Sequence, residues 1–216
     1  MRKIAKSILI LLSAVVFGAF CYGLIVIVEA RSVTEERFDS FLNSSQNRIA
    51  IDELSGEQLD ALLRIEDPAF YDHNGFDVST PGAGLTTITQ SLVKRFFFDD
   101  FKPGFGKIRQ TLIAVFAVDP LVSKEDQLTV FINEFPFRDD VRGLADASSF
   151  YFGKSLFELS QDEFLGIVAM FIAPSHFDIK DQPLRNQTRV NKMKAVLKGD
   201  YIPLTNGDVY HDQETR

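Results

Sequence analysis

A threonine-rich stretch followed by basic residues has the composition of an anion-binding site. Thr87 and Gln90 have the spacing of a capping box at the start of a helix. Such a start carries free N–H groups and a partial positive charge, and both favour phosphate-like groups. Thr86, Thr87 and Gln90 could add side-chain donors, and Lys94 follows one to two turns later. The segment from 90 to 110 is also basic, with Lys94, Arg95, Lys102, Lys107 and Arg109 against Asp99 and Asp100. A solvated helix face is the alternative interpretation.

A second group of polar residues surrounds Glu66. Asp67 and Pro68 are typical of a helix cap and first turn, so we expect a helix to begin directly after Glu66. That place can hold a carboxylate in a fixed orientation, although a solvated or capping acid is the simpler interpretation. We expect Asp67, His73 and Asp77 to shape the following turn. The chain has three histidines, and none has the paired spacing of metal ligands, so no zinc site is predicted.

The elements that position these residues are expected to be helices. Apolar residues recur at helical spacing from Ile88 to Phe96 and from Lys107 to Val118. Ser123 is a candidate cap for a further helix, and Ser160 with Glu163 forms another capping box. Alternating strand patterns are scarce. The sequence therefore predicts a mainly α domain.

Phenylalanine is unusually frequent, with 21 copies against five tyrosines and no tryptophan. Five of these lie within ten residues that also contain Lys102 and Pro103: Phe96, Phe97, Phe98, Phe101 and Phe105. The mixture of aromatic and basic residues is typical of a segment that docks at a membrane interface. Packing into the core is the alternative.

The N-terminal segment predicts a membrane anchor. Residues Ile8 to Val28 carry no charge, and a helix of this length spans a hydrocarbon core of roughly 30 Å. Arg2, Lys3 and Lys6 precede the apolar run, so the positive-inside rule places the N-terminus in the cytoplasm and exports the remainder. A cleaved signal peptide is the alternative.

Composition excludes some classes of function. The chain has 216 residues and a formal net charge of -7, which disfavours a broad attraction to nucleic acid. Its single cysteine, Cys21, lies within the apolar run, so no intrachain disulfide can form.

Three segments resemble, in order, the motifs of a known enzyme family. They are EDPAFYDHNGFD (66–77), GLTTITQSLVKR (84–95) and SKEDQLTVFIN (123–133). The family is the peptidoglycan glycosyltransferases, glycosyltransferase family 51, which comprises monofunctional transglycosylases and the N-terminal domain of class A penicillin-binding proteins. The resemblance implies a lysozyme-like α fold. The resemblance covers roughly residues 60–200. Together with the composition of the two ends, it divides the chain into a cytoplasmic N-terminus and anchor (1–30), a stalk (31–60), a glycosyltransferase-like domain (61–200) and a flexible tail (201–216).

The resemblance also implies a reaction and a site. Family members polymerise glycan from lipid II at the outer face of the bacterial cytoplasmic (inner) membrane, with inversion and release of undecaprenyl pyrophosphate. Glu66 would be the catalytic base, and Mg²⁺ or Mn²⁺ could accompany the pyrophosphate. The expected partners are lipid II, the growing glycan, the membrane and other cell-wall synthesis proteins. The implied substrate-binding residues are Asp67, His73, Thr86, Thr87, Gln90, Lys94, Lys107 and Arg109.

The chain departs from the family at two motifs. The third motif, Arg-Lys-x-x-Glu, reads GKIRQ here, with Gly106 for the arginine and Gln110 for the glutamate. Thr129 stands where the fourth motif usually has a glutamate. An amide cannot hold negative charge or exchange a proton at neutral pH, so Gln110 is a degenerate catalytic position. Three interpretations follow: a divergent enzyme, a lipid II-binding or scaffold protein without turnover, and an anchored interaction domain.

The charge pattern around Ile8–Val28 predicts the topology. A reporter enzyme that is active only after export should be active when it is fused after Arg216, because the positive-inside rule exports this end. A matched fusion to a reporter that is active only in the cytoplasm should be inactive. The opposite pattern of activities would reverse the orientation.

Overall fold

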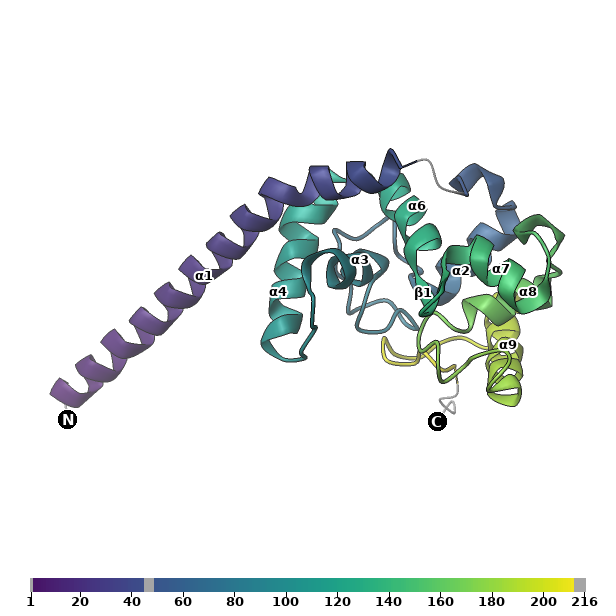
Figure 1. Cartoon of the computed structure of the whole chain (residues 1–216). Coiled ribbons are helices and arrows are strands. Elements are labelled where there is room, and N and C mark those ends of the chain that lie inside the picture. The colour runs from purple at the N-terminus through teal and green to yellow at the C-terminus, as the bar shows by residue number, and fades with distance from the viewer. Residues whose placement is uncertain (1, 45–48, 212–216) are drawn as a thin grey trace.

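The computed structural model describes residues 2–44 and 49–211, with side chains from Ile4 onward. A long N-terminal helix, α1 (Arg2–Leu42), leads into a helical domain (Figure 1). The described part contains one short antiparallel hairpin of two strands, so the prediction of a mainly α domain is confirmed. After α1 the elements are η1 (Ile51–Glu53), α2 (Gly56–Glu66), α3 (Ile88–Phe97), α4 (Phe105–Ile113), η2 (Ala114–Val118), α5 (Asp119–Leu121), α6 (Lys124–Glu134), β1 (Pro136–Arg138), β2 (Val141–Arg142), α7 (Gly143–Phe152), η3 (Leu156–Glu158), α8 (Gln161–Val168) and α9 (Pro183–Lys198).

Helix α1 has two parts with different surroundings. Its apolar first part projects away from the domain (Figure 1) and is long and apolar enough to cross a membrane. From Val26 onward one side is buried: Val26, Ala30, Thr34 and Phe38 are each at most 4% exposed. These residues are four apart, so they form one stripe along the helix. The helix that carries the candidate membrane-spanning segment is therefore also part of the folded domain.

The buried stripe of α1 faces α4, α6 and η2. The Arg31 guanidinium donates a hydrogen bond to the backbone carbonyl of Phe116 at 2.8 Å. The Phe38 ring lies 5.1 Å from that of Phe96 in α3, and the Arg37 guanidinium lies 4.8 Å from the centre of the Phe97 ring. Part of the phenylalanine-rich segment thus packs against α1, as the core-packing alternative proposed.

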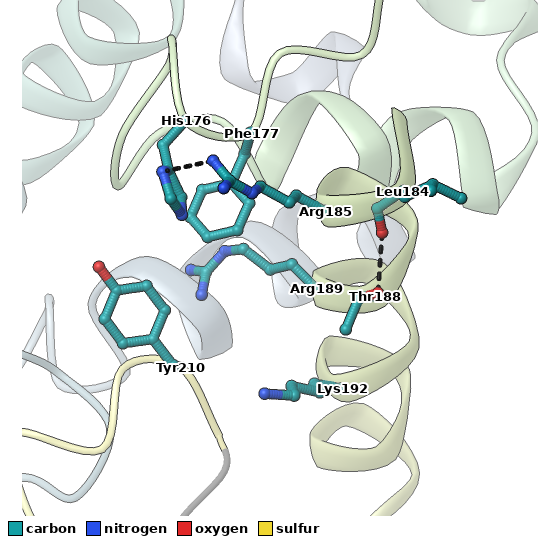
Figure 2. Close-up of a pocket in the computed structure, with 8 residues that line it drawn as sticks. All are labelled: His176, Phe177, Leu184, Arg185, Thr188, Arg189, Lys192 and Tyr210. Carbon is teal, nitrogen blue, oxygen red and sulfur yellow. Dashed lines mark hydrogen bonds between the residues drawn. The ribbon is translucent and has the colours of Figure 1, made fainter. Parts of the chain in front are cut away.

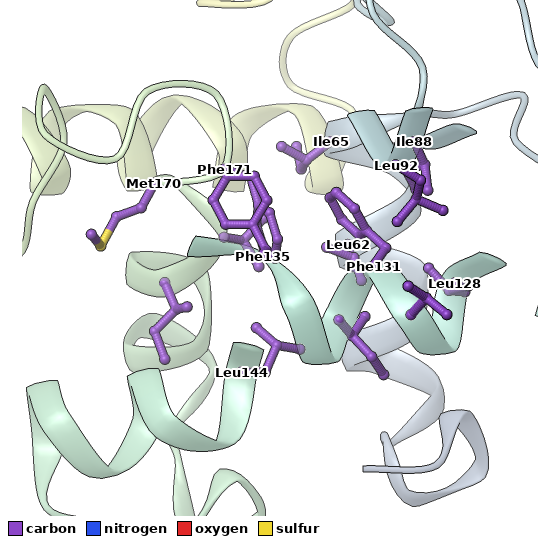
Figure 3. Close-up of a cluster of buried hydrophobic side chains, with 14 of the residues drawn as sticks. Leu62, Ile65, Ile88, Leu92, Leu128, Phe131, Phe135, Leu144, Met170 and Phe171 are labelled. Atoms are coloured by element: carbon purple, nitrogen blue, oxygen red, sulfur yellow. The ribbon is translucent and has the colours of Figure 1, made fainter. Parts of the chain in front are cut away.

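The core forms where α2, α3, α6, α7 and α8 meet (Figure 3). Leu62, Leu92, Leu128 and Leu144 bring four of these helices together and are at most 1% exposed. The rings of Phe131 and Phe135 at the end of α6 lie 4.8 and 4.4 Å from that of Phe171. Dense burial of this kind fixes the helices that carry the polar residues of interest.

Helix starts follow the local sequence signals closely. The capping boxes at Thr87–Gln90 and Ser160–Glu163 are both formed, as predicted. Ser123 caps α6 by accepting a hydrogen bond from the backbone N–H of Asp126 at 3.0 Å.

The helix expected over residues 107–118 is present, but it begins at Phe105, and its last five residues are not α-helical. Its last part, η2, is a π-helix, a wider turn often found at functional sites. Gly75 packs against it with φ of 78°, and a Cβ there would lie 2.8 Å from the Ala114 carbonyl oxygen. The chain therefore requires glycine at this contact.

One expected helix start is wrong. Asp67 and Pro68 do not open a helix, because Glu66 is the last residue of α2 and Asp67 is its C-terminal cap. Residues 68–75 form turns instead. Helix α2 has its own start signal, since Ser55 and Gln58 form a capping box. Glu66 therefore stands at the end of a helix.

The C-terminal segment differs from the expected flexible tail as far as residue 211. The backbone N–H groups of Gly82 and Gly84 donate to the carbonyls of Thr205 and Asn206 at 2.9 and 2.8 Å. Asp208 is 1% exposed. Residues 201–211 are thus held against the loop that precedes α3. The remainder of the predicted tail lies outside the described residues.

The packing of α1 on the domain gives a stability prediction. Phe38→Ala should lower the free energy of unfolding by about 3–5 kcal/mol, because truncating a buried phenylalanine leaves a cavity. Thermal and denaturant unfolding of the detergent-solubilised protein would measure the loss. Phe157→Ala is the matched control, since Phe157 is 60% exposed. Equal effects of the two variants would mean that α1 does not pack on the domain as described.

Candidate active site

Glu66 has the properties of a proton acceptor. Its side chain is 14% exposed, and its Oε1 atom has no hydrogen-bond partner among the described residues. The nearest cation is the Arg189 guanidinium, at 3.9 Å from Oε1. The pKa of Glu66 is raised to about 7, and burial is the main cause. The Arg189 charge lowers this pKa and the Asp67 charge raises it, but both effects are smaller than that of burial. A carboxyl group with a pKa near 7 can accept or release a proton at neutral pH.

Asp67 connects the helix that carries Glu66 to the start of α3. Its buried carboxylate accepts hydrogen bonds from the Ile88 backbone N–H and from His73 Nε2, both at 2.9 Å. His73 Nδ1 accepts the Gly75 N–H at 3.0 Å, so the ring proton sits on Nε2. Asp67 and His73 were predicted to bind substrate. They face each other inside the protein, where they position Glu66.

Asp77 shapes the turn after this pair, as expected. Its carboxylate accepts the backbone N–H groups of Ser79 and Thr80 at 2.7 and 3.2 Å. These bonds hold the pKa of Asp77 at about 2 despite the opposing effect of burial.

The predicted anion site at the start of α3 is more internally bonded than its sequence indicates. Thr87 and Gln90 are 2% and 0% exposed, so neither side chain is available to a ligand. Thr87 Oγ1 donates to the Gly75 carbonyl and accepts the Gln90 N–H. The Ile88 N–H is bonded to Asp67. Two of the backbone donors expected to bind an anion, the N–H groups of Ile88 and Gln90, are thus already used within the protein.

Lys107 supplies the charge that the helix start does not offer. Its Nζ donates to Thr86 Oγ1 at 2.9 Å and to Gln90 Oε1 at 3.2 Å. Burial lowers the pKa of Lys107 to about 8, and the nearby Lys94 contributes. Lys107 therefore remains mostly protonated at neutral pH, next to an accessible threonine hydroxyl.

Two further predicted cations lie on rings of the phenylalanine-rich segment. Lys94 Nζ is 5.1 Å from the centre of the Phe101 ring, and the Arg109 guanidinium is 5.1 Å from that of Phe98. These distances are typical of cation–π contacts. Lys94 lies close enough to Lys107 to lower its pKa, whereas Arg109 contacts Phe98 at the opposite, C-terminal end of α3.

Gln110 is fixed inside the domain beside these cations. It is 1% exposed, and its Nε2 donates to the backbone carbonyl of Gln90 at 2.6 Å. Its Oε1 has no partner among the described residues. The side chain therefore links α4 to α3 through a donor that an ionised carboxylate lacks.

Arg189 is the site residue that sequence reasoning missed. It is 3% exposed, lies on α9, and donates to the Val209 carbonyl at 2.8 Å. Burial lowers the pKa of its guanidinium, and Glu66 opposes that effect. No local pattern indicated this role, because its partner Glu66 lies 123 positions earlier in the sequence.

The described residues contain no group of three His, Cys, Asp or Glu side chains placed to hold a metal ion. The donors around Lys107 are a hydroxyl and amide groups, which do not form a metal cage without carboxylates.

Comparisons with known proteins place these residues in context. A family model described as transglycosylase matches residues 79–198, which include Lys107, Gln110 and Arg189. Penicillin-binding protein 1A of Haemophilus influenzae is 34% identical over 158 residues, covering 67% of this chain and 18% of that protein. Penicillin-binding protein 1F of Bacillus subtilis is 28% identical, covering 73% and 24%. A monofunctional glycosyltransferase of Staphylococcus haemolyticus is 27% identical, covering 74% and 67%. The chain thus spans about a fifth of the length of these penicillin-binding proteins.

The raised pKa of Glu66 predicts a pH-dependent stability. Folding raises this pKa from 4.5 to about 7, so the stabilisation is full below pH 4.5 and is lost as pH rises through 7. The Glu66→Gln variant has no ionisable group at this position, so it does not lose stability in this way as the pH rises. The free energy of unfolding of the variant, relative to wild type, should increase by about 3 kcal/mol between pH 4 and pH 8.

Denaturant unfolding at a series of pH values would measure this difference. Glu57→Gln, an exposed change on the same helix, is the control and should show a much smaller trend. A flat difference for Glu66→Gln would contradict the described environment of Glu66.

Proposed function

The chain belongs to the transglycosylase family, and on this premise we propose that it polymerises peptidoglycan glycan strands from lipid II. The observation that carries the proposal is Glu66, a largely buried carboxylate with a pKa near 7 and an oxygen that has no partner among the described residues. It lies within the same domain as the cations around Lys107. A base next to an anion-binding region suits the displacement of a phosphate leaving group by a hydroxyl.

In the proposed reaction Glu66 accepts the proton of the acceptor sugar hydroxyl. The hydroxyl oxygen forms a bond to the anomeric carbon of the growing chain, with inversion. The bond from that carbon to the pyrophosphate breaks, and undecaprenyl pyrophosphate leaves with the electron pair. Ionised Glu66 is required, so the rate should rise with pH through an apparent pKa near 7.

The leaving group would be stabilised by the cations near the start of α3. Lys107 and Thr86 are in hydrogen-bond contact and can bind one phosphate together. Lys94 adds charge from its position on the Phe101 ring, and Arg109 adds charge from farther away, at the Phe98 end of α3. We expect any Mg²⁺ or Mn²⁺ to be held by pyrophosphate oxygens, since the described residues offer no carboxylate cage.

The membrane would bring the substrate to this site. Helix α1 is a candidate single-pass anchor, and Phe105, Ile108 and Phe116 on the neighbouring helix are 87%, 55% and 48% exposed. We propose that these side chains enter the interface of the bacterial cytoplasmic membrane, with the domain on its outer face. Lipid II, the growing glycan and other cell-wall synthesis proteins are the proposed partners.

Gln110 favours a second candidate, a protein that binds lipid II without turnover. A buried amide occupies the position where the family has a glutamate, and it is bonded to the Gln90 carbonyl. The cations remain in place beside this amide, so we expect binding of the pyrophosphate to be retained. Loss of a proton-exchanging group would affect the chemical step alone.

Glycan synthesis by the detergent-solubilised protein from purified lipid II tests the first candidate. Glu66→Gln should reduce the rate by about 10²–10⁴-fold, because the amide cannot accept a proton. Lipid II affinity should stay within a fewfold of the wild-type value. Asp60→Asn, an exposed change on the same helix, is the matched control. Undiminished synthesis by Glu66→Gln would remove Glu66 from the mechanism.

Gln110→Glu separates the two candidates. A glutamate at this position must keep its proton to donate to the Gln90 carbonyl, so it would be an acid within the site. If the wild type only binds lipid II, this variant should gain glycan synthesis while retaining its affinity. A wild type that is already active, with little change in Gln110→Glu, would favour the enzyme. Circular dichroism and unfolding curves would verify that the variant folds.

A further inference from the structure

A second basic region lies on the other side of Glu66, around a pocket of about 270 Å³ on α9 (Figure 2). One wall is α9, another is the loop after α8, and the third is Tyr210 of the C-terminal segment. No predicted substrate-binding residue belongs to it. Its lining residues are His176, Phe177, Leu184, Arg185, Thr188, Arg189, Lys192 and Tyr210.

Three cations line the pocket, Arg185, Arg189 and Lys192, and no carboxylate among the described residues lines it. The Arg185 guanidinium donates to His176 Nδ1 at 3.2 Å, so this histidine faces it with an acceptor nitrogen. The spacing of 185, 189 and 192 places the three cations on one side of α9 (Figure 2).

Arg189 is incompletely compensated inside the protein. Its guanidinium lies between the rings of Phe177 and Tyr210, at 5.3 and 5.8 Å from their centres. Its Nε has no hydrogen-bond partner among the described residues. Its contact with Glu66 is long, at 3.9 Å. A buried cation with these contacts would be stabilised by an anion in the pocket.

The location of the pocket limits which anion could bind next to Arg189. Arg189 both lines the pocket and contacts Glu66, so the pocket and the base share this residue. Lys107 lies on α4, and Figure 1 shows α4 and α9 at opposite ends of the domain. A substrate at Glu66 therefore has one basic region on either side.

The substrate of the proposed function carries two anionic groups on its reacting sugar. Pyrophosphate is attached to the anomeric carbon, and a short peptide with free carboxylates is attached through the lactyl ether at C3. The pyrophosphate leaves in the reaction, whereas the peptide stays on the product. Phe177, Leu184 and Tyr210 offer apolar contacts to the small aliphatic side chains of such a peptide.

We propose that the Arg185–Arg189–Lys192 pocket binds a carboxylate of the peptide on the reacting muramic acid. The inference rests on the proposed function for the identity of the substrate, and on the cations of the pocket for the negative charge of the bound group. By holding the peptide, the pocket would orient the anomeric carbon toward the acceptor hydroxyl at Glu66, with the pyrophosphate toward Lys107.

The experiment uses the full chain in detergent and two lipid-linked disaccharide probes. One carries the peptide with free carboxylates, and the other carries the same peptide with every carboxylate converted to a carboxamide. Both lack the acceptor hydroxyl, so that no polymerisation occurs while affinity is measured. Conversion to the carboxamide should weaken binding to the wild type by about tenfold, since each charged hydrogen bond contributes about that factor.

Arg185→Gln and Lys192→Gln should weaken binding of the carboxylate probe about tenfold and leave binding of the carboxamide probe unchanged. Lys198→Gln, an exposed change on the last turn of α9, is the matched control and should alter neither affinity.

Equal wild-type affinities for the two probes would overturn the proposal. So would variants that weaken both probes equally, because the pocket would then bind the pyrophosphate that the probes share. Discrimination between the probes by a protein that makes no glycan would retain the pocket and reject turnover. Binding of neither probe would reject both.

Discussion

The buried carboxylate of Asp67 accepts one hydrogen bond from the first turn of α3 and another from His73. Because Asp67 directly follows Glu66, these bonds also fix the end of α2. His73 in turn accepts the N–H of Gly75, the glycine that packs against the π-helix η2. A short stretch of chain therefore connects α2, α3 and the α4–η2 region. The orientation of Glu66 and the location of the cations depend on this connection.

The two ends of the described chain reach the same site from different directions. Helix α1 packs on α4 and η2, so the candidate anchor supports the helix that carries Lys107 and Gln110. The C-terminal segment packs on the loop before α3 and accepts a hydrogen bond from Arg189. Both contacts join residues far apart in the sequence. Their effect is to fix the loop that presents Thr86 and the helix that presents Arg189.

The sequence predicted the features that depend on neighbouring residues and missed those that depend on tertiary contacts. The capping boxes at Thr87 and Ser160 and the cap at Ser123 were recognised because each depends on residues three positions apart. Glu66 was predicted to lie before a helix because Asp-Pro is compatible with a helix start. In the structure Asp67 caps the end of α2 and accepts a hydrogen bond from the backbone N–H of Ile88 in α3, 21 positions away. The burial of Thr87 and Gln90 and the role of Arg189 depend on tertiary contacts, which no local spacing indicates.

Helix α1 contains no break between its apolar part and the stripe that packs on the domain. A helix rises about 1.5 Å per residue and resists bending, so the proposed anchor would hold Glu66 at a fixed distance from the lipid headgroups. Under the proposed function, such a protein would not extend toward a chain end that has moved away from the bilayer. Each addition would occur at the same height, and the finished part of the polymer would be displaced outward by the length of the unit just added.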